Sequence, residues 1–181
     1  MINQNTLDGI SDDIAKLAES VKHAFPDEII EKTIPFSDIA EGNVEEYLDS
    51  LSEWEKQYRQ CPYIYIIKAI GGAELGRCRA KFAKAKIEKV EARAYARLND
   101  ESETLYVGSS HNISKRISEH FGLGYRGTYA LQMKNWVAGL DGSVQISIAR
   151  FDAAIDRSVL QAVEDGLWQM DQPMFGRRGA R

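Results

Sequence analysis

The segment that most constrains the fold is ETLYVGSSHNISKRISEHFG, at residues 103–122, because it joins a short apolar strand to a helix through a polar turn. The strand is predicted to end at Gly108, and Ile113, Ile117 and Phe121 then repeat every fourth residue. That spacing puts the three side chains on one face of a helix, which is expected to pack inward. The segment therefore predicts a strand and a helix that share one core.

Two further segments are predicted to complete a small sheet. YIYIIKA, at residues 63–69, is β-branched and aromatic, which is typical of a strand buried on both faces. TLYVG, at 104–108, is predicted to lie beside it like a hairpin partner, and SVQISIARF, at 143–151, alternates like a third strand. We therefore expect an α+β fold, with a small three-stranded, mostly antiparallel sheet flanked by helices. One helix is predicted after Asp156 as its N-cap and another within residues 124–140.

Residues 1–60 are predicted to form an acidic, helical N-terminal extension to a second unit at residues 61–181. The extension holds 14 acids and 5 bases and the second unit 13 acids and 18 bases, so net charges of −9 and +5 sum to −4. Helices are expected from Ser11, as N-cap, to Pro26 and again within residues 43–60. The basic second unit suggests an anionic partner, although solvated helices often carry similar charge biases.

Between the first two predicted strands lies an insertion at about residues 73–100, which is alanine-rich and free of proline. It is predicted to be one helix of about six turns. Such a basic helix can follow a phosphate backbone, and the loop at 124–129 offers another cation. The alternative is a solvated helix that packs through Phe82, Ile87, Val90 and Ala94. The candidate DNA-binding residues are Arg77, Lys81, Lys84, Arg93 and Arg126.

Five residues are candidates for chemistry. Tyr65 and Tyr106 lie in the middle of adjacent predicted strands, which can bring their phenols together, although tyrosine in a strand is more often core packing. Arg116 and His120 lie one turn apart beside the apolar helix face, where the arginine can bind phosphate oxygens and the histidine can relay or orient a proton. Glu164 lies within an apolar helical stripe, where a carboxylate needs a cation or a salt bridge to Arg116.

These residues resemble the signature of the GIY-YIG nuclease superfamily over roughly residues 62–179. YIYIIKA is similar to the first signature strand, and LYVGSSHNISKRISEHF to the second signature and its helix. ISIARFD, followed by VLQAVEDGLWQMDQPMFGRRG, resembles the third strand, the glutamate helix and the closing loop. Two positions depart from the family pattern: Tyr63 stands where the first glycine is usual, and Gly176 where an asparagine is usual.

The resemblance implies a metal-dependent endonuclease that hydrolyses phosphodiester bonds in double-stranded DNA. It implies that Tyr65 and Tyr106 are the active-site tyrosines and that Arg116 stabilises phosphate charge, with His120 beside it. Glu164 is then the ligand of Mg²⁺ or Mn²⁺. We expect Tyr106 to be the general base, with Tyr65 as the alternative.

Several functions remain open at this point. The first is a sequence-specific, restriction-like enzyme, and the second is a structure-selective repair or recombination nuclease. A third is a DNA-binding module whose catalysis is impaired by Gly176. A fourth is a toxin-like or phage-defence nuclease in which residues 1–60 cover the basic face. Cutting both strands of a palindrome requires two active sites and hence a homodimer on the DNA.

Cys61 and Cys78 lack the spacing of a metal site, so we expect two reduced thiols, no zinc and a cytoplasmic protein. The sequence has no apolar run of about 18 residues, which predicts that no helix spans a membrane.

Overall fold

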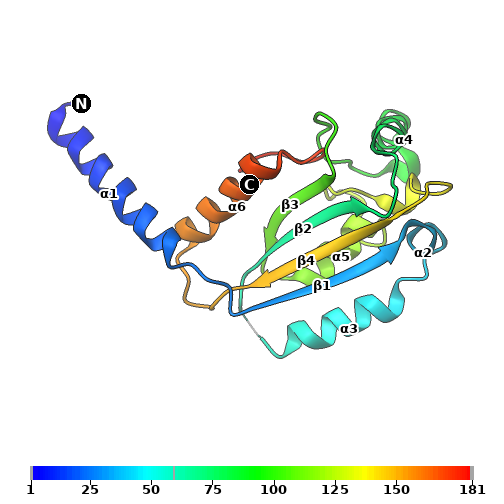
Figure 1. The fold of residues 1–181 in the computed structure, drawn as a ribbon, viewed down its shortest axis with the longest axis horizontal. Coiled ribbons are helices and arrows are strands. Elements are labelled where there is room, and N and C mark those ends of the chain that lie inside the picture. The colour runs from blue at the N-terminus through cyan, green and yellow to red at the C-terminus, as the bar shows by residue number, and fades with distance from the viewer. Residues whose placement is uncertain (1, 59, 180–181) are drawn as a thin grey trace.

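The computed structural model describes residues 2–58 and 60–179 and confirms an α+β fold. Four strands in this part of the chain form one antiparallel sheet of order β1-β4-β2-β3, where the sequence predicted three strands (Figure 1). The strands are β1 (Glu28–Pro35), β2 (Tyr63–Ile70), β3 (Thr104–Ser110) and β4 (Ser143–Arg150). The helices are α1 (Gln4–Lys22), α2 (Phe36–Glu41), α3 (Glu45–Lys56), α4 (Leu75–Glu88), α5 (Ile113–Phe121) and α6 (Arg157–Asp171), with short 3₁₀ turns η1 (Val90–Ala92) and η2 (Met133–Asn135).

The strand that sequence reasoning missed is β1, because the extension at residues 1–60 was predicted to be helical. β1 pairs with β4 along its whole length and forms one edge of the sheet. Ile30 and Ile34 lie on the face of β1 that packs against the core. Pro35 is tolerated because it is the last residue of a strand at the sheet edge. Residues 1–60 therefore supply a sheet strand as well as three helices.

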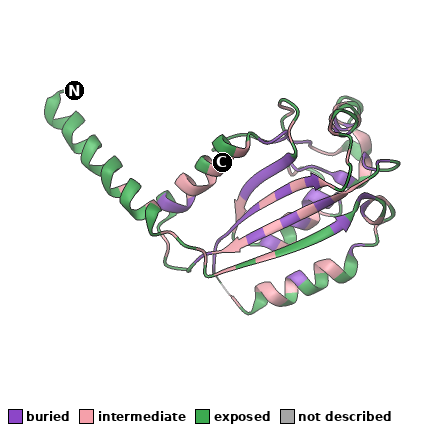
Figure 2. Cartoon of the chain, in the orientation of Figure 1, coloured by how far each residue is buried: buried purple, intermediate pink, exposed green. Residues whose placement is uncertain are grey.

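The first helix also differs from its prediction. α1 begins at Gln4, with Asn3 rather than Ser11 as its N-cap, and the Asn3 side chain accepts a hydrogen bond from the backbone N–H of Thr6 at 3.0 Å. Although its apolar residues share one face, Ile14 is 62% exposed and α1 contains no buried residue. α1 contacts α6 and extends away from the sheet, exposed along most of its length (Figure 2).

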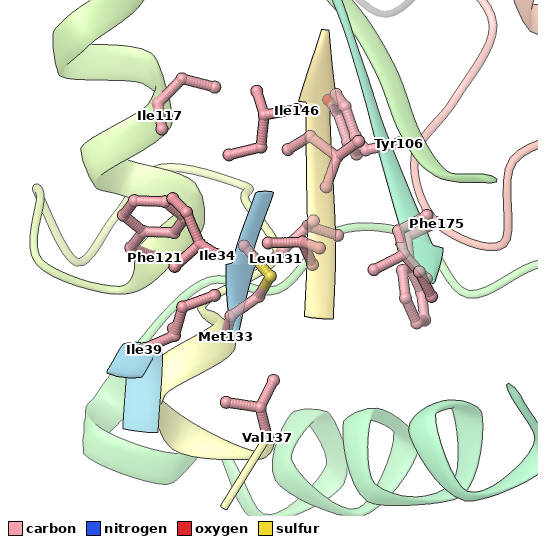
Figure 3. Close-up of a cluster of buried hydrophobic side chains, with 14 of the residues drawn as sticks. Ile34, Ile39, Tyr106, Ile117, Phe121, Leu131, Met133, Val137, Ile146 and Phe175 are labelled. Carbon is pink, nitrogen blue, oxygen red and sulfur yellow. The ribbon is translucent and has the colours of Figure 1, made fainter. Parts of the chain in front are cut away.

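The two faces of the sheet carry unequal cores. The larger core contains α5, whose Ile113, Ile117 and Phe121 are fully buried, as predicted. Figure 3 shows Ile117 and Phe121 beside Ile146 of β4, with Tyr106 in the same buried cluster. On the opposite face, α6 packs over a smaller cluster. The sheet edge at β3 therefore lies between α5 and α6.

The insertion is a shorter helix than predicted. α4 ends at Glu88 because Lys89 adopts a left-handed conformation (φ 49°), and Glu91 and Ala92 also have positive φ. The chain then runs without helix through residues 93–99, with isolated bridges from Tyr95 to Ala130 and from Leu98 to Phe175. An interior of aromatic rings holds this region together.

That interior is centred on Phe82, which is fully buried against the rings of Tyr95, Trp136 and Phe175. Ile87, in contrast, is 81% exposed, although the alternative of a solvated helix included it among the packing residues. The helix predicted within residues 124–140 is a loop with the single turn η2, because its buried side chains follow this aromatic cluster rather than a helical period.

Cys61 and Cys78 are both buried free thiols. Within residues 2–58 and 60–179, no helix combines the length and apolar character needed to cross a bilayer.

Candidate active site

The pairing of β2 with β3 brings the two candidate tyrosines together. Tyr65 lies directly opposite Gly108, and Tyr106 precedes Gly108 by two residues, so both rings are on the same face of the sheet. Their ring planes are 5° from parallel, with centroids 6.0 Å apart. The structure therefore confirms that adjacent strands bring these two phenols together.

Gly108 makes this arrangement possible because it has no side chain. A Cβ at this position would lie 2.8 Å from the phenol oxygen of Tyr65 and 2.9 Å from a ring carbon of Tyr106. Both distances are shorter than normal contacts, and both rings are buried, so neither has room to move away. The glycine that ends the β3 signature thus leaves the space that the paired phenols occupy.

We predict that Gly108→Ala separates the two phenols and lowers stability by about 1–3 kcal/mol, which is typical of an overpacked core. Gly166→Ala is the matched control, because Gly166 lies in α6 with open space around it and the change should stabilise the helix by about 0.5–1 kcal/mol. Urea unfolding of the two variants measures both effects. Equal stability of the two variants would contradict the close packing around Gly108.

The helix that carries Arg116 is anchored at its N-terminus by a neighbouring helix. The Glu55 carboxylate of α3 accepts hydrogen bonds from the backbone N–H groups of Ile113 at 2.6 Å and Ser114 at 3.2 Å. Asn112 provides the N-cap and accepts from the backbone N–H of Lys115 at 3.1 Å. A carboxylate at this end also suits the helix dipole. The N-terminal extension thus helps to position α5 through Glu55.

Arg116 is the central residue of the cluster. Its Nε–H donates to the Tyr65 phenol oxygen at 3.0 Å, and one Nη donates to the Tyr106 phenol oxygen at 3.1 Å and to the Tyr129 carbonyl at 3.1 Å. The other Nη forms an ion pair of 3.0 Å with Glu119, a residue that is 6% exposed. Four of the five N–H groups of this guanidinium therefore have partners within the chain. The arginine presents fixed positive charge to both phenols.

His120 is fully buried, and its neighbours determine its tautomer. The backbone N–H of Leu131 donates to Nδ1 at 3.2 Å, so the proton of the neutral ring lies on Nε2. That Nε2–H donates to the Tyr65 phenol oxygen, 2.9 Å away. Burial, and then the charge of Arg116, lower the pKa of His120 well below its usual value. Of the two roles that the sequence allowed, His120 has the geometry to orient a phenol rather than to relay a proton.

The two phenols consequently differ. The Tyr65 oxygen accepts from both Arg116 and His120, and Tyr65 is 1% exposed. Burial raises the pKa of Tyr65 well above its usual value, so it stays protonated near neutral pH. Tyr106 is 9% exposed, and among these hydrogen bonds its oxygen accepts only the one from Arg116. Tyr106 is thus the more accessible phenol.

Glu164 reaches the cluster from α6, around the β3 edge. One carboxylate oxygen accepts a hydrogen bond of 2.6 Å from the Ser109 hydroxyl. Burial raises the pKa of Glu164, with a smaller contribution from the charge of Asp165. Glu164 lines a cavity of about 590 Å³ with Tyr65, Tyr106 and Arg116. Arg116 forms its ion pair with Glu119 and not with Glu164. Of the two partners that the sequence allowed for Glu164, a salt bridge to Arg116 is therefore absent and a bound cation remains.

A hard divalent cation fits this carboxylate. No group of three potential metal-ligating side chains occurs among residues 2–58 and 60–179. Mg²⁺, however, often binds through one or two carboxylates and completes its shell with water and substrate phosphate oxygens. Glu164 is half-buried, opens on a cavity and has one oxygen fixed by Ser109, which suits that mode of binding.

The closing loop places Gly176 against the Tyr106 ring. Gly176 has φ 104°, and a Cβ there would lie 2.9 Å from a ring carbon of Tyr106, so an asparagine does not fit this loop conformation. An amide reaches the loop from elsewhere, because Asn99 Nδ2 donates to the carbonyls of Pro173 and Gly176 at 3.0 Å each. Sequence reasoning missed Asn99, which nothing in its local pattern distinguishes.

Most of the candidate DNA-binding residues have partners within the chain. Arg77 and Lys81 donate to the carbonyls of Gly139 and Ala138, and Lys84 faces Glu88 at 3.9 Å. The Arg93 side chain is 8% exposed and donates to Gln132 and to the Gly124 carbonyl. The Arg93 side chain is therefore held within the fold, whereas Arg126 is exposed. DNA contact by these five residues stays a prediction.

Three further cations line a cavity beside the phenols, and two of them, Lys86 and Arg97, belong to the basic insertion. Lys86, Arg97 and Arg177 line a second cavity of about 510 Å³, which Tyr106 and Arg116 also line. The three come from α4, from the extended segment after it and from the closing loop, so only the tertiary structure brings them together. No acidic side chain of the described residues lines this cavity.

Acidic residues of the N-terminal extension form ion pairs away from this second cavity. Asp27 and Glu28 face Arg150, at 2.8 and 3.7 Å. No ion pair within residues 2–58 and 60–179 joins this segment to Lys86, Arg97 or Arg177. Among the described residues, no ion pair therefore supports the interpretation that residues 1–60 cover the basic face.

Comparison with known proteins adds no relative: the chain matches no family model, no curated protein and no solved structure.

Proposed function

We propose that this protein is a metal-dependent DNA endonuclease of the GIY-YIG type that hydrolyses phosphodiester bonds. One observation carries the proposal. The phenols of Tyr65 and Tyr106 both accept hydrogen bonds from Arg116, beside a cavity that the Glu164 carboxylate also lines. The resemblance of the two signature segments points to the same residues. Arginine and a carboxylate around one cavity suit a reaction in which negative charge develops on phosphate oxygens.

In the proposed reaction, Tyr106 acts as a phenolate and takes a proton from water while the water oxygen bonds to the phosphorus. The P–O bond to the departing deoxyribose oxygen breaks, and that oxygen takes a proton from solvent. Tyr106 is assigned this role because it is the more accessible phenol and lines the cavity with Glu164. Tyr65 is held by Arg116 and His120, so it orients the water or the phosphate. When Tyr106 is deprotonated, its oxygen stays hydrogen-bonded to the Arg116 guanidinium. The positive charge of this guanidinium also lies beside the bound phosphate.

Glu164 is the proposed ligand for Mg²⁺ or Mn²⁺, with Ser109 fixing the direction of its carboxylate. A cation bound there supplies charge neutralisation at the phosphate and the leaving oxygen. The carboxylate must be ionised to bind a cation. Because burial raises the pKa of Glu164, the site should lose its cation at a less acidic pH than an exposed glutamate would.

The catalytically impaired DNA-binding module is the second candidate, because Gly176 stands at the position where the family usually has asparagine. The loop nevertheless receives two hydrogen bonds from Asn99. We propose that Asn99 holds the closing loop against Tyr106, so that the loss of the usual amide does not by itself prevent catalysis.

The proposed substrate is double-stranded DNA, cut in a sequence-specific, restriction-like manner. A structure-selective repair or recombination nuclease is the alternative, and a homodimer on the DNA would allow both strands to be cut. To separate them, the protein is incubated with Mg²⁺ and either a supercoiled plasmid or a four-way DNA junction, and the ends are mapped by sequencing. We expect plasmid ends at a repeated sequence. Cleavage of the junction alone would favour the structure-selective enzyme, and cleavage of neither substrate would contradict the nuclease proposal.

A further inference from the structure

The second cavity, which Lys86, Arg97 and Arg177 line, has no role in the proposed reaction. It shares Tyr106, Arg116 and Arg177 with the cavity that Glu164 lines, so the two adjoin at the phenols. A DNA strand whose scissile phosphate lies in the first cavity would place a neighbouring phosphate at the second. Side chains that line the second cavity are therefore the candidates for binding that neighbouring phosphate.

The cations around this cavity are unusually concentrated. Lys86 is half-buried, and its ammonium donates to the Ala96 carbonyl at 2.6 Å. Burial, followed by the positive charges of Arg177 and Arg97, lowers the pKa of Lys86, which means that the three cations repel one another. Clustered like charges are unfavourable in the free protein and become favourable when an anion binds between them.

The two arginines are free to move toward an anion, whereas other bases nearby are committed. Arg97 and Arg177 are exposed, and neither side chain forms an ion pair within residues 2–58 and 60–179. Arg178, the next residue along the loop, instead donates to Gln169 at 3.1 Å and lines neither cavity. The closing loop thus directs one arginine to the cavity and the next one away from it.

We propose that Lys86, Arg97 and Arg177 form a second phosphate-binding subsite, which takes a phosphate next to the scissile one on the same DNA strand. This inference rests on the proposed function, because it names the neighbouring part of the same substrate. Arginine binds phosphate oxygens through two N–H groups, and Lys86 adds a further positive charge to the cavity lining. The subsite sets the register of the strand relative to Tyr106 and Arg116.

The test compares the double variant Arg97→Ala, Arg177→Ala with Lys32→Ala, Arg178→Ala, which loses the same charge from exposed positions outside both cavities. Binding of a fluorescent 16-base-pair duplex is followed by anisotropy in EDTA from 50 to 200 mM KCl, and plasmid nicking is followed in Mg²⁺. We expect the first variant to bind roughly tenfold or more weakly and to lose about one unit of the slope of log affinity against log salt. Circular dichroism checks that both variants fold.

The outcomes separate the inference from the function on which it rests. If the wild type nicks plasmid and the two double variants bind and nick alike, the subsite is wrong and the nuclease proposal stands. If the wild type does not nick but only the cavity variant loses affinity and salt slope, the site binds phosphate and the nuclease proposal is wrong. If there is no nicking and no difference in binding, both are overturned.

Discussion

Replacing Arg116 by lysine should lower the rate of plasmid nicking by about 10²–10³-fold, which is the typical cost of removing one positioned donor from a charge-stabilising site. Lysine keeps the positive charge but not the planar group that reaches both phenols at once. DNA affinity should change little, because the charge remains. The loss should therefore appear in the rate of a single turnover at saturating protein.

Lysine is preferred to alanine for a physical reason. Arg116→Ala would leave the buried carboxylate of Glu119 without its ion-pair partner, and breaking such a pair typically costs about 3–5 kcal/mol. A loss of activity in that variant would then be confounded with unfolding. Arg178→Lys, at an exposed position on the closing loop, is the matched control and should nick at the wild-type rate. A folded Arg116→Lys variant with wild-type activity would remove Arg116 from the mechanism.

Replacing Glu164 by glutamine should lower Mg²⁺-dependent nicking by about 10²-fold or more, because the amide cannot replace a charged metal ligand. Thermal stability at pH 7 should stay the same or rise. Folding raises the pKa of this carboxyl group, so the ionised form costs stability above that pKa, and glutamine removes this cost. The Ser109 hydroxyl still finds an acceptor in the amide oxygen. A variant that is inactive and no less stable would mark Glu164 as functional rather than structural.

Asp165→Asn is the control for Glu164. The negative charge of Asp165 contributes to the raised pKa of Glu164, so removing it should lower that pKa. The variant should keep its activity at neutral pH, and the fall of its activity with decreasing pH should move to a lower pH than in the wild type. An unchanged pH profile would contradict the role of Glu164 ionisation, and loss of activity at neutral pH would assign chemistry to the wrong carboxylate.

Local sequence patterns were sufficient for the elements that carry the phenols and the arginine. β2, β3 and α5 each have a recognisable pattern within about ten residues, and Gly122 ends α5. The predicted end of the second strand at Gly108 was wrong, because β3 continues to Ser110 and stays paired with β2 there. The approach of Tyr65 to Tyr106 also followed from the sequence, because both tyrosines lie within strands that were predicted to be adjacent. Their shared contact with Arg116 then depends on α5 packing over that face.

The missed features depend on contacts between distant segments. β1 was missed because its alternation is short and its charged residues face solvent at the sheet edge, which resembles a helix surface or a loop. The end of α4 was missed because Lys89 is not a residue that usually stops a helix, and the aromatic cluster around Phe82 redirects the chain there. Lys86 and Arg97 both lie in the basic insertion, but Arg177 is about 80 residues further along the chain, and no local pattern relates it to them.

The most direct test of the central claim is single-turnover nicking of a supercoiled plasmid by the wild type, Arg116→Lys and Glu164→Gln, each in Mg²⁺ and in EDTA, with DNA binding measured in parallel. If the phenols, the guanidinium and the carboxylate form one metal-dependent site, only the wild type in Mg²⁺ should nick rapidly, while all three proteins bind the plasmid. Rapid nicking by a folded variant, or wild-type nicking that persists in EDTA, would contradict it.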